Sequence, residues 1–374
     1  MNNKRRSMTR LVAAVVTVGG LVVAGAGGAA AQPDPRTWLA AVSPVAPHPA
    51  KPPRVTLSVA ARVPVGATVA IAGTVRPAAP RSPVMLQRRS SGSWQTVVTK
   101  KLTRKSTYRF SRTFANTGDR RFRVVVPRHG SAHMIKSTAR TVHVTTPGRD
   151  VSFPQCQRGL PAGSFGIVGV DGGRPFDVNA CLAPEIAWAA AFGPPAYYVN
   201  TADPGPTMSS HWPIGQLSPR VCDPSSLDSS DCSYDYGWNA ATDSYVRAAT
   251  AAASAGAPPV SSATWWLDAE TGNTWESLEF GQTAPYFAND TSALTGARDY
   301  LRAQGVPAVG VYSTVAQWQQ LTGGASLGRA PVWYAGLGGP SSAAAHCAST
   351  YSFTGGPVRL TQYAKGGFDA DNAC

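Results

Sequence analysis

Cysteine is missing from the first 155 residues, and the six cysteines fall at positions 156, 181, 222, 232, 347 and 374. No two of them form a C-x-x-C pair, and His211 and His346 are not at ligand spacing from one another. These absences argue against a metal site, and we expect neither a metal nor another cofactor. In an exported chain, an even number of cysteines indicates disulfides. Pairing between neighbours (156–181, 222–232 and 347–374) is the simplest of many connectivities.

Long hydrophobic runs are equally scarce. Leu11–Val23 is the longest, and it is too short and too rich in glycine to anchor a chain in a membrane. A basic head precedes this run, and Ala29-Ala30-Ala31 follows it. This pattern predicts a secretory signal peptide over residues 1–31, cleaved before Gln32. We therefore expect a secreted protein, extracellular or associated with the cell wall, with no transmembrane segment in the mature chain.

Acidic residues are almost missing from residues 51–150, which hold 20 Lys and Arg against 2 Asp. Residues 151–374 reverse the balance, with 9 Lys and Arg against 17 Asp and Glu. Such asymmetry predicts two modules with different partners, divided near Pro147-Gly148. Residues 32–53 are rich in proline and alanine, which predicts an extended linker in front of the first module.

The first module, residues 54–146, shows the alternation of apolar and polar residues that is typical of short strands. Seven such runs, separated by turn signals such as Thr117-Gly118-Asp119, predict an all-β sandwich. Leu86-Gln87-Arg88, followed by Gly92-x-Trp94, resembles the immunoglobulin-like domains of bacterial surface proteins. That resemblance implies an immunoglobulin-like sandwich.

Several outward positions of these strands are basic, among them Arg109, Arg121 and Arg123. A solvated surface explains part of this charge, but so large an excess costs self-repulsion and exceeds what solubility requires. We therefore predict an anionic wall polymer as the partner of this module. Nucleic acid is not expected, because no aromatic-interleaved basic stripe is present.

The second module, residues 152–374, alternates short apolar runs with helical stretches, which predicts an α/β fold. The expected strands are Phe165–Asp171, Ala196–Asn200, Tyr234–Trp238, Thr264–Glu270, Ala308–Ser313, Pro331–Ala335, Val358–Tyr363 and Gly367–Asp369. The expected helices cover residues 183–191, 241–255, 292–304 and 314–321. This order fits a (β/α)8-type TIM barrel that is irregular at its C-terminal end.

Asp268 and Glu270 end one of these strands, on either side of Ala269. Residues i and i+2 of a strand share a face about 6–7 Å apart, close to the carboxyl spacing that glycosidases use. A solvated strand end or half of a calcium site would show the same pattern. Asp171 and Asp369 close other expected strands, and strand ends meet at one rim of such a barrel. This convergence favours a catalytic site.

Several strand motifs resemble family 25 glycoside hydrolases, the lysozyme-like muramidases that cut peptidoglycan. They are Gly169-Val170-Asp171, Leu267-Asp268-Ala269-Glu270, Val311-Tyr312-Ser313, Trp333-Tyr334-Ala335 and Gln362-Tyr363 with Phe368-Asp369. The resemblance implies that Glu270 is the general acid, that Asp268 and Asp171 position or stabilise the reacting sugar, and that Asp369 lies at the floor. Whether water or the substrate's own acetamido group is the nucleophile stays open.

Two departures from that family stand out. The second strand ends in Asn200-Thr201-Ala202-Asp203 rather than in a Lys-x-x-Glu type element, and residues 203–233 form a long insertion. The chain is thus more similar to divergent glycoside-hydrolase-like domains of secreted bacterial proteins. For substrate binding we expect Tyr198, Tyr334 and Gln362, with Trp275 stacking on a sugar. We expect Glu185, Glu276 and Glu279 on the surface.

Taken together, these features predict a secreted glycoside hydrolase that acts on cell-wall polysaccharide by general acid catalysis. Two alternatives remain open. The barrel is either a wall-binding or structural module without activity, or a hydrolase of another polysaccharide.

Overall fold

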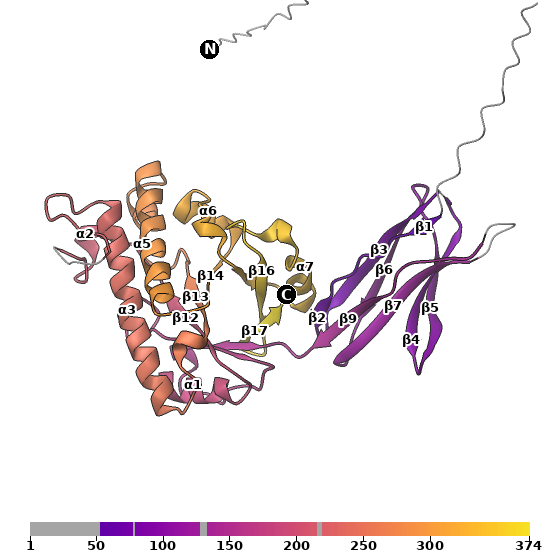
Figure 1. The fold of residues 1–374 in the computed structure, drawn as a ribbon, viewed down its shortest axis with the longest axis horizontal. Coiled ribbons are helices and arrows are strands. Elements are labelled where there is room, and N and C mark those ends of the chain that lie inside the picture. Colours follow the sequence, from indigo (N-terminus) through magenta and orange to yellow (C-terminus); the bar gives the residue numbers. More distant parts are fainter. Residues whose placement is uncertain (1–52, 78, 128–132, 215–218) are drawn as a thin grey trace, which may run out of the picture. The chain divides into compact units, whose positions relative to one another are not determined.

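The computed structural model describes residues 53–77, 79–127, 133–214 and 219–374. The predicted signal peptide, and the predicted linker up to residue 52, lie outside the described residues. Strands β1–β9 form two smaller sheets, and strands β10–β17 form one eight-stranded sheet (Figure 1).

The two smaller sheets have the strand orders β1-β3-β6 and β2-β9-β7-β4-β5, with β8 paired to β7. Their strands are β1 (Arg54–Val55), β2 (Arg62–Pro64), β3 (Thr68–Arg76), β4 (Pro83–Ser90), β5 (Ser93–Lys101), β6 (Thr107–Thr113), β7 (Gly118–Val126), β8 (Ile135–Lys136) and β9 (Arg140–Thr145). Ile71 and Phe110 of one sheet share a buried core with Leu86, Phe122 and Val124 of the other. The alternation of apolar residues therefore builds a two-layer sandwich.

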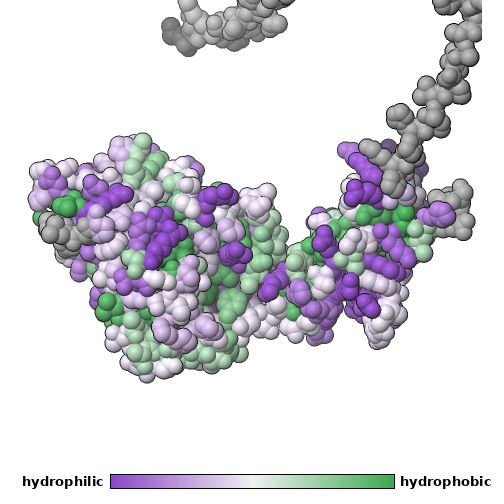
Figure 2. Space-filling model, viewed as in Figure 1, coloured by the Kyte–Doolittle hydropathy of each residue, from purple (hydrophilic) through white to green (hydrophobic). Residues whose placement is uncertain are grey.

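The outer surface of the sandwich carries the basic residues. Arg109 and Arg121 are exposed, while Arg123 is half-buried because it lies over the Trp94 ring at 4.3 Å. Nε of Arg123 also donates a 2.8 Å hydrogen bond to Gln87. Figure 2 shows many strongly hydrophilic residues on the face of the sandwich that it displays. The basic side chains thus face solvent, as the alternation predicts.

The eight-stranded sheet follows the chain order from β10 to β17. Its strands are β10 (Arg149–Val151), β11 (Gly166–Gly169), β12 (Ala196–Asn200), β13 (Thr264–Asp268), β14 (Ala308–Ser313), β15 (Val332–Leu337), β16 (Val358–Lys365) and β17 (Phe368–Ala373). Neighbours from β10 to β16 are parallel, whereas β17 is antiparallel to β16. The sheet begins at residue 149, so the predicted module start at 152 is three residues late.

Backbone hydrogen bonds nearly close this sheet into a barrel. The amide of Gly148, just before β10, donates to the carbonyl of Asp371 at 2.8 Å, and the amide of Asp371 donates back at 3.0 Å. The first and last strands of the sheet therefore lie side by side. We call residues 149–374 the barrel.

Helices cover the barrel strands unevenly. The α-helices are α1 (Leu182–Ala190), α2 (Gly205–Met208), α3 (Ser230–Ser254), α4 (Glu276–Glu279), α5 (Ala284–Ala303), α6 (Val315–Thr322) and α7 (Pro340–His346). Short 3-10 helices are η1 (Phe153–Gln155), η2 (Val260–Ser262), η3 (Leu327–Arg329) and η4 (Ser349–Tyr351). Every connection from β11 to β16 contains an α-helix. Between β10 and β11 the described residues contain only η1, and β16 meets β17 in a hairpin.

The strand predicted at Tyr234–Trp238 is wrong, because these residues lie inside α3. The helix begins after Ser229, whose side chain accepts a hydrogen bond from the amide of Cys232, and Asp231 lies in its first turn. Both are helix start signals, and they outweigh a five-residue alternation. The count of eight strands holds because β10 takes the place of this segment.

Helices α3 and α5 lie side by side (Figure 1). Two glycines allow the contact: a Cβ on Gly237 would lie 1.9 Å from the carbonyl oxygen of Ala293, and one on Gly296 would lie 2.0 Å from that of Tyr234. No side chain fits at such distances, so the backbones of the two helices are in direct contact. This contact holds α3, which follows the loop after β12, against α5, which follows the loop after β13.

All six cysteines are paired, as Cys156–Cys181, Cys222–Cys232 and Cys347–Cys374. The prediction that neighbours pair is confirmed, and every bridge lies in the barrel. Within the described ranges, no helix combines the length and the apolar character needed to cross a membrane.

Candidate functional site

A cavity of about 190 Å³ opens at the carboxyl ends of the parallel strands. We call it the acid cavity. Its lining residues are Asp150, Ser152, Pro154, Gln155, Tyr198, Asp268, Glu270, Tyr312, Trp333, Gln362 and Asp369. Parallel strands end at the same rim, and Asp369 reaches it from the start of β17 because that strand runs in the opposite direction. Residues from both ends of the barrel sequence thus meet in one place.

Asp268 and Glu270 both line the acid cavity, and Ala269 between them is buried, as the alternation predicts. Asp268 is only 5% exposed, and its Oδ2 accepts a 2.9 Å hydrogen bond from the side-chain amide (Nδ2) of Asn200. Its Oδ1 is buried without a partner among the described residues. Glu270 is more open, and Nε2 of Gln317 approaches its Oε1 at 3.5 Å.

Burial raises the pKa of Asp268 well above its usual range, and the carboxyls of Glu270, Asp150 and Asp171 add to that rise. Burial also raises the pKa of Glu270, with a further contribution from Asp369. A buried oxygen without a donor favours the protonated acid, which agrees with the direction of the pKa shift at Asp268.

Asp150 is the carboxyl that the sequence reasoning missed. Nε2 of Gln362 donates to its Oδ2 at 3.2 Å, and the buried carboxyl of Asp371 is a close neighbour. Burial, with Asp150 nearby, raises the pKa of Asp371 well above its usual range. Burial and nearby Asp369 raise the pKa of Asp150 to about 7, while the hydrogen bond from Gln362 acts against the rise.

The local sequence held one signal for Asp150. The residue stands between Arg149 and Val151, and the turn Ser152-Phe153-Pro154-Gln155 follows Val151. An acid in a strand followed by a turn is the same pattern that marked Asp268. Because Asp150 lies between the predicted boundary near Pro147-Gly148 and the predicted module start at residue 152, the sequence places it in the segment between the two modules.

Asp171 does not line the acid cavity, so the structure does not bring it together with the other three predicted catalytic carboxyls there. It is 1% exposed, and its Oδ2 accepts a 3.0 Å hydrogen bond from the backbone amide of Asn200. Its Oδ1 lies 2.9 Å from the hydroxyl of Ser244 on α3. Burial raises the pKa of Asp171 to about 8. The residue ties the end of β11 to β12 and α3, behind the cavity wall.

The predicted substrate-binding residues divide into two groups. Tyr198 and Gln362 line the acid cavity, as expected from their strands. Trp275 is fully buried and donates a 2.9 Å hydrogen bond to the carbonyl of Glu270, so its ring has no face for a sugar. Tyr334 lies outside the cavity and packs against His346 at 5.0 Å between ring centroids. The structure therefore does not bring Trp275 or Tyr334 into the acid cavity, where they were expected to bind a sugar.

Two glutamates expected on the surface are buried as well. Glu185 accepts a 2.7 Å hydrogen bond from Asn179, and Glu276 accepts one of the same length from Asn289. Burial raises the pKa of each to about 7. Only Glu279 of the three is exposed.

No protein-family model matches this chain, and a search of curated proteins finds no match. Among solved structures, the solution structure of the CARDB domain of a Pyrococcus furiosus protein is similar at 16% sequence identity, with a TM-score of 0.19. The match covers 25% of this chain and 93% of that domain. The functional argument therefore depends on the residues of this chain alone.

Proposed function

We propose that the protein is a secreted glycoside hydrolase that acts on cell-wall glycan, similar in its chemistry to family 25 muramidases. One observation carries the proposal. Four carboxyls line one cavity together with aromatic side chains: Asp150 from β10, Asp268 and Glu270 from the end of β13, and Asp369 from β17. Glycosidic bonds are cut by paired carboxyls with different proton affinities, one of which donates a proton to the leaving oxygen.

Glu270 is the proton donor in this proposal. It is the least buried member of the Asp268–Glu270 pair, so a glycosidic oxygen entering the cavity meets it first. Its raised pKa keeps a fraction of it protonated closer to neutral pH than an ordinary glutamate. Gln317, whose Nε2 lies 3.5 Å away, orients the carboxyl.

Asp150 is the negative charge in this proposal. Nε2 of Gln362 donates to its Oδ2 at 3.2 Å, and a pKa of about 7 leaves part of it ionised at neutral pH. Donors fixed in advance stabilise an anion without reorganisation, and that anion stabilises positive charge developing on the sugar. Asp369, which is half-buried, adds to the negative potential, and Asp268 supplies a neutral acid at the deep end of the cavity.

We further infer that the barrel is a (β/α)8-type fold and that the sandwich is immunoglobulin-like. The unbroken parallel order from β10 to β16, with helices in the connections from β11 onward, supports the first inference. The two-sheet core supports the second. Three disulfides suggest an oxidising compartment, which supports export, and the basic sandwich supports attachment to an anionic wall polymer.

The direct test is incubation of the full mature chain with purified peptidoglycan and with other cell-wall polysaccharides. Falling turbidity together with new reducing ends supports the proposal, and mass spectrometry of the products identifies the bond that is cut. Loss of turbidity without new reducing ends contradicts it, because no glycosidic bond has then been hydrolysed.

A second candidate function is glycan binding without turnover. The altered end of the second strand favours it, because Asn200-Thr201-Ala202-Asp203 stands where family 25 enzymes have a Lys-x-x-Glu type element. Under this alternative the chain binds wall glycan with measurable affinity, and no reducing ends appear over long incubation with any of the glycans.

A further inference from the structure

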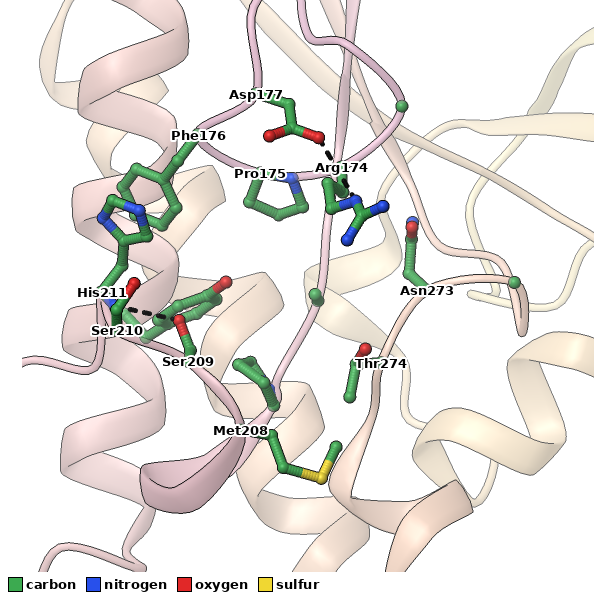
Figure 3. A pocket seen from close by; sticks show the side chains of 15 residues that line it. Arg174, Pro175, Phe176, Asp177, Met208, Ser209, Ser210, His211, Asn273 and Thr274 are labelled. Atoms are coloured by element: carbon green, nitrogen blue, oxygen red, sulfur yellow. Dashed lines mark hydrogen bonds and ion pairs between the residues drawn. The ribbon is translucent and has the colours of Figure 1, made fainter.

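The insertion at residues 203–233 builds a second cavity, of about 480 Å³, beside the acid cavity. Three loops surround it, and they follow β11, β12 and β13 (Figure 3). Residues 215–218 of the insertion lie outside the described residues. We call this cavity the insertion pocket. Among the described residues, it has no lining residue in common with the acid cavity.

The wall contributed by the insertion has a small core of its own. Trp212, Tyr236 and the Cys222–Cys232 bridge are buried together, and Phe176 from the loop after β11 packs against them. The indole of Trp212 donates a 3.1 Å hydrogen bond to the carbonyl of Leu227. A core and a bridge behind a loop hold its surface in one shape, which lowers the entropy cost of binding.

This core fixes a flat ring at the pocket surface. The imidazole of His211 is stacked on Phe176, with 4.1 Å between ring centroids and 8° between planes, and Phe176 meets Tyr236 edge-on at 5.7 Å. His211 is nevertheless exposed, so the ring face turned away from Phe176 is available to a ligand. A rigid flat ring beside polar groups suits a ligand that has one apolar face and a polar rim.

The remaining lining groups offer hydrogen bonds without net charge. Figure 3 shows Arg174 near Asn273 on one side and Ser209 near His211 on the other. Arg174 is ion-paired with Asp177 at 3.2 Å, which leaves that pair neutral. Hydroxyl and amide groups therefore dominate, and they match a neutral, hydroxyl-rich ligand.

The two cavities are joined through one turn of the chain. Glu270 lines the acid cavity, and Gly272 and Asn273 line the insertion pocket. The amide of Asn273 donates a 3.2 Å hydrogen bond to the carbonyl of Glu270, so the turn is closed. Three residues span at most about 11 Å, which places both cavities within reach of one extended ligand.

We propose that the insertion pocket binds a neutral sugar unit of the glycan next to the bond presented to the acid cavity. This inference rests on the proposed glycan substrate. It gives a role to the insertion and to its disulfide: they add recognition area that the smaller acid cavity lacks. Specificity for the glycan then comes from the pocket that His211 and Asn273 line.

The test is calorimetric titration of the full mature chain carrying Glu270→Gln with chitotetraose, a neutral oligosaccharide. A hyaluronan tetrasaccharide, which adds carboxylates to a similar sugar, is the comparison probe. We expect chitotetraose to bind more tightly. Adding His211→Ala should weaken its binding at least about fivefold, and Asn273→Ala should act in the same direction. His211→Tyr keeps a flat ring and should bind more tightly than His211→Ala.

His133→Ala removes an exposed histidine of the sandwich and is the matched control, with unchanged binding expected. Equal affinity in the His211→Ala, Asn273→Ala and control chains overturns the inference. So does tighter binding of the anionic probe, or no saturable binding of chitotetraose. If the binding results are as expected but the wild type cuts no glycan, the inference about the insertion pocket stands and the hydrolase proposal is refuted.

Discussion

Nε2 of Gln362 on β16 lies 3.2 Å from Oδ2 of Asp150 on β10, across 212 residues of sequence. The other end of the same amide is occupied as well, since Oε1 of Gln362 accepts a 2.8 Å hydrogen bond from the hydroxyl of Tyr312. The tyrosine therefore fixes the amide with its donor side toward Asp150. Under the proposed function, this hydrogen bond is what suits Asp150 to act as the anion of the acid cavity.

Asp150→Asn should lower kcat on cell-wall glycan by roughly 10²-fold or more, because it removes a preorganised charge from the cavity. Release of reducing ends measures the effect. Glu279→Gln, an exposed acid in the same module, is the control and should retain full activity. Full activity in Asp150→Asn would exclude Asp150 from the mechanism.

Stability should fall as pH rises from about 5 to about 8. Burial raises the pKa of Asp171 to about 8 and those of Glu185 and Glu276 to about 7, so the folded protein binds more protons than the unfolded chain across this range. The free energy of unfolding then decreases with rising pH until each folded-state pKa has been passed. Thermal melting at a series of pH values measures this loss of stability. A melting temperature that rises between pH 5 and pH 8 would contradict the prediction.

Asp171→Asn should remove part of that pH dependence. The hydroxyl of Ser244 lies 2.9 Å from both Asp171 Oδ1 and the carbonyl of Ala240, and it carries a single proton. Because the carbonyl only accepts, a protonated Asp171 supplies the other bond, and an asparagine amide does the same. The variant should melt near the wild type at pH 5 and above it at pH 8. A variant that melts below the wild type at both pH values would show that the carboxylate form is the native one.

Reduction should unfold the barrel before the sandwich, since all three bridges lie in the barrel. Each bridge commonly contributes about 2–4 kcal/mol. Tryptophan fluorescence follows the barrel almost alone, because Trp94 is the one described tryptophan in the sandwich. We expect its melting temperature to fall after reduction and alkylation. Free thiols in the untreated protein, or an unchanged melting curve, would contradict this prediction.

Binding of the full chain to a purified anionic wall polymer should weaken sharply between 0.15 M and 1 M salt. The screening length shortens from about 8 Å to about 3 Å over this range, and exposed arginines act through solvent. Replacing Arg109, Arg121 and Arg123 by glutamine should reduce both the affinity and its dependence on salt. Equal binding at both salt concentrations would show that the interaction is not electrostatic.

The sequence predicted most of the barrel strands because their apolar runs are long and end in turns. Ala196–Asn200 and Ala308–Ser313 match β12 and β14 residue for residue. Tyr234–Trp238 failed because a short alternation does not distinguish a strand from one buried side of a helix, and the start of α3 was overlooked. β10 was missed because three residues beside a proline-glycine boundary carry almost no periodic signal.

For the acid cavity, the D-x-E spacing was enough to place Asp268 and Glu270 together. Long-range contacts were not predictable in the same way. Asp171 lies just after β11 and Asp268 is the last residue of β13, so both mark the end of a buried strand, yet α3 covers Asp171 through Ser244. Trp275 follows the D-x-E turn, but its indole turns back to the Glu270 carbonyl and into the core. Whether a side chain next to a turn points into the cavity or into the core depends on contacts with residues far away in the sequence, and the local sequence does not show these contacts.

The central claim is that Glu270 donates the proton that cleaves a cell-wall glycan. Release of reducing ends from purified peptidoglycan by the wild type, Glu270→Gln and Glu279→Gln tests it most directly. Because glutamine keeps the shape but has no proton to donate, Glu270→Gln should lose about 10²–10⁴-fold in rate while Glu279→Gln stays active. Equal rates in the wild type and Glu270→Gln, or no reducing ends from any of the three, would contradict the claim.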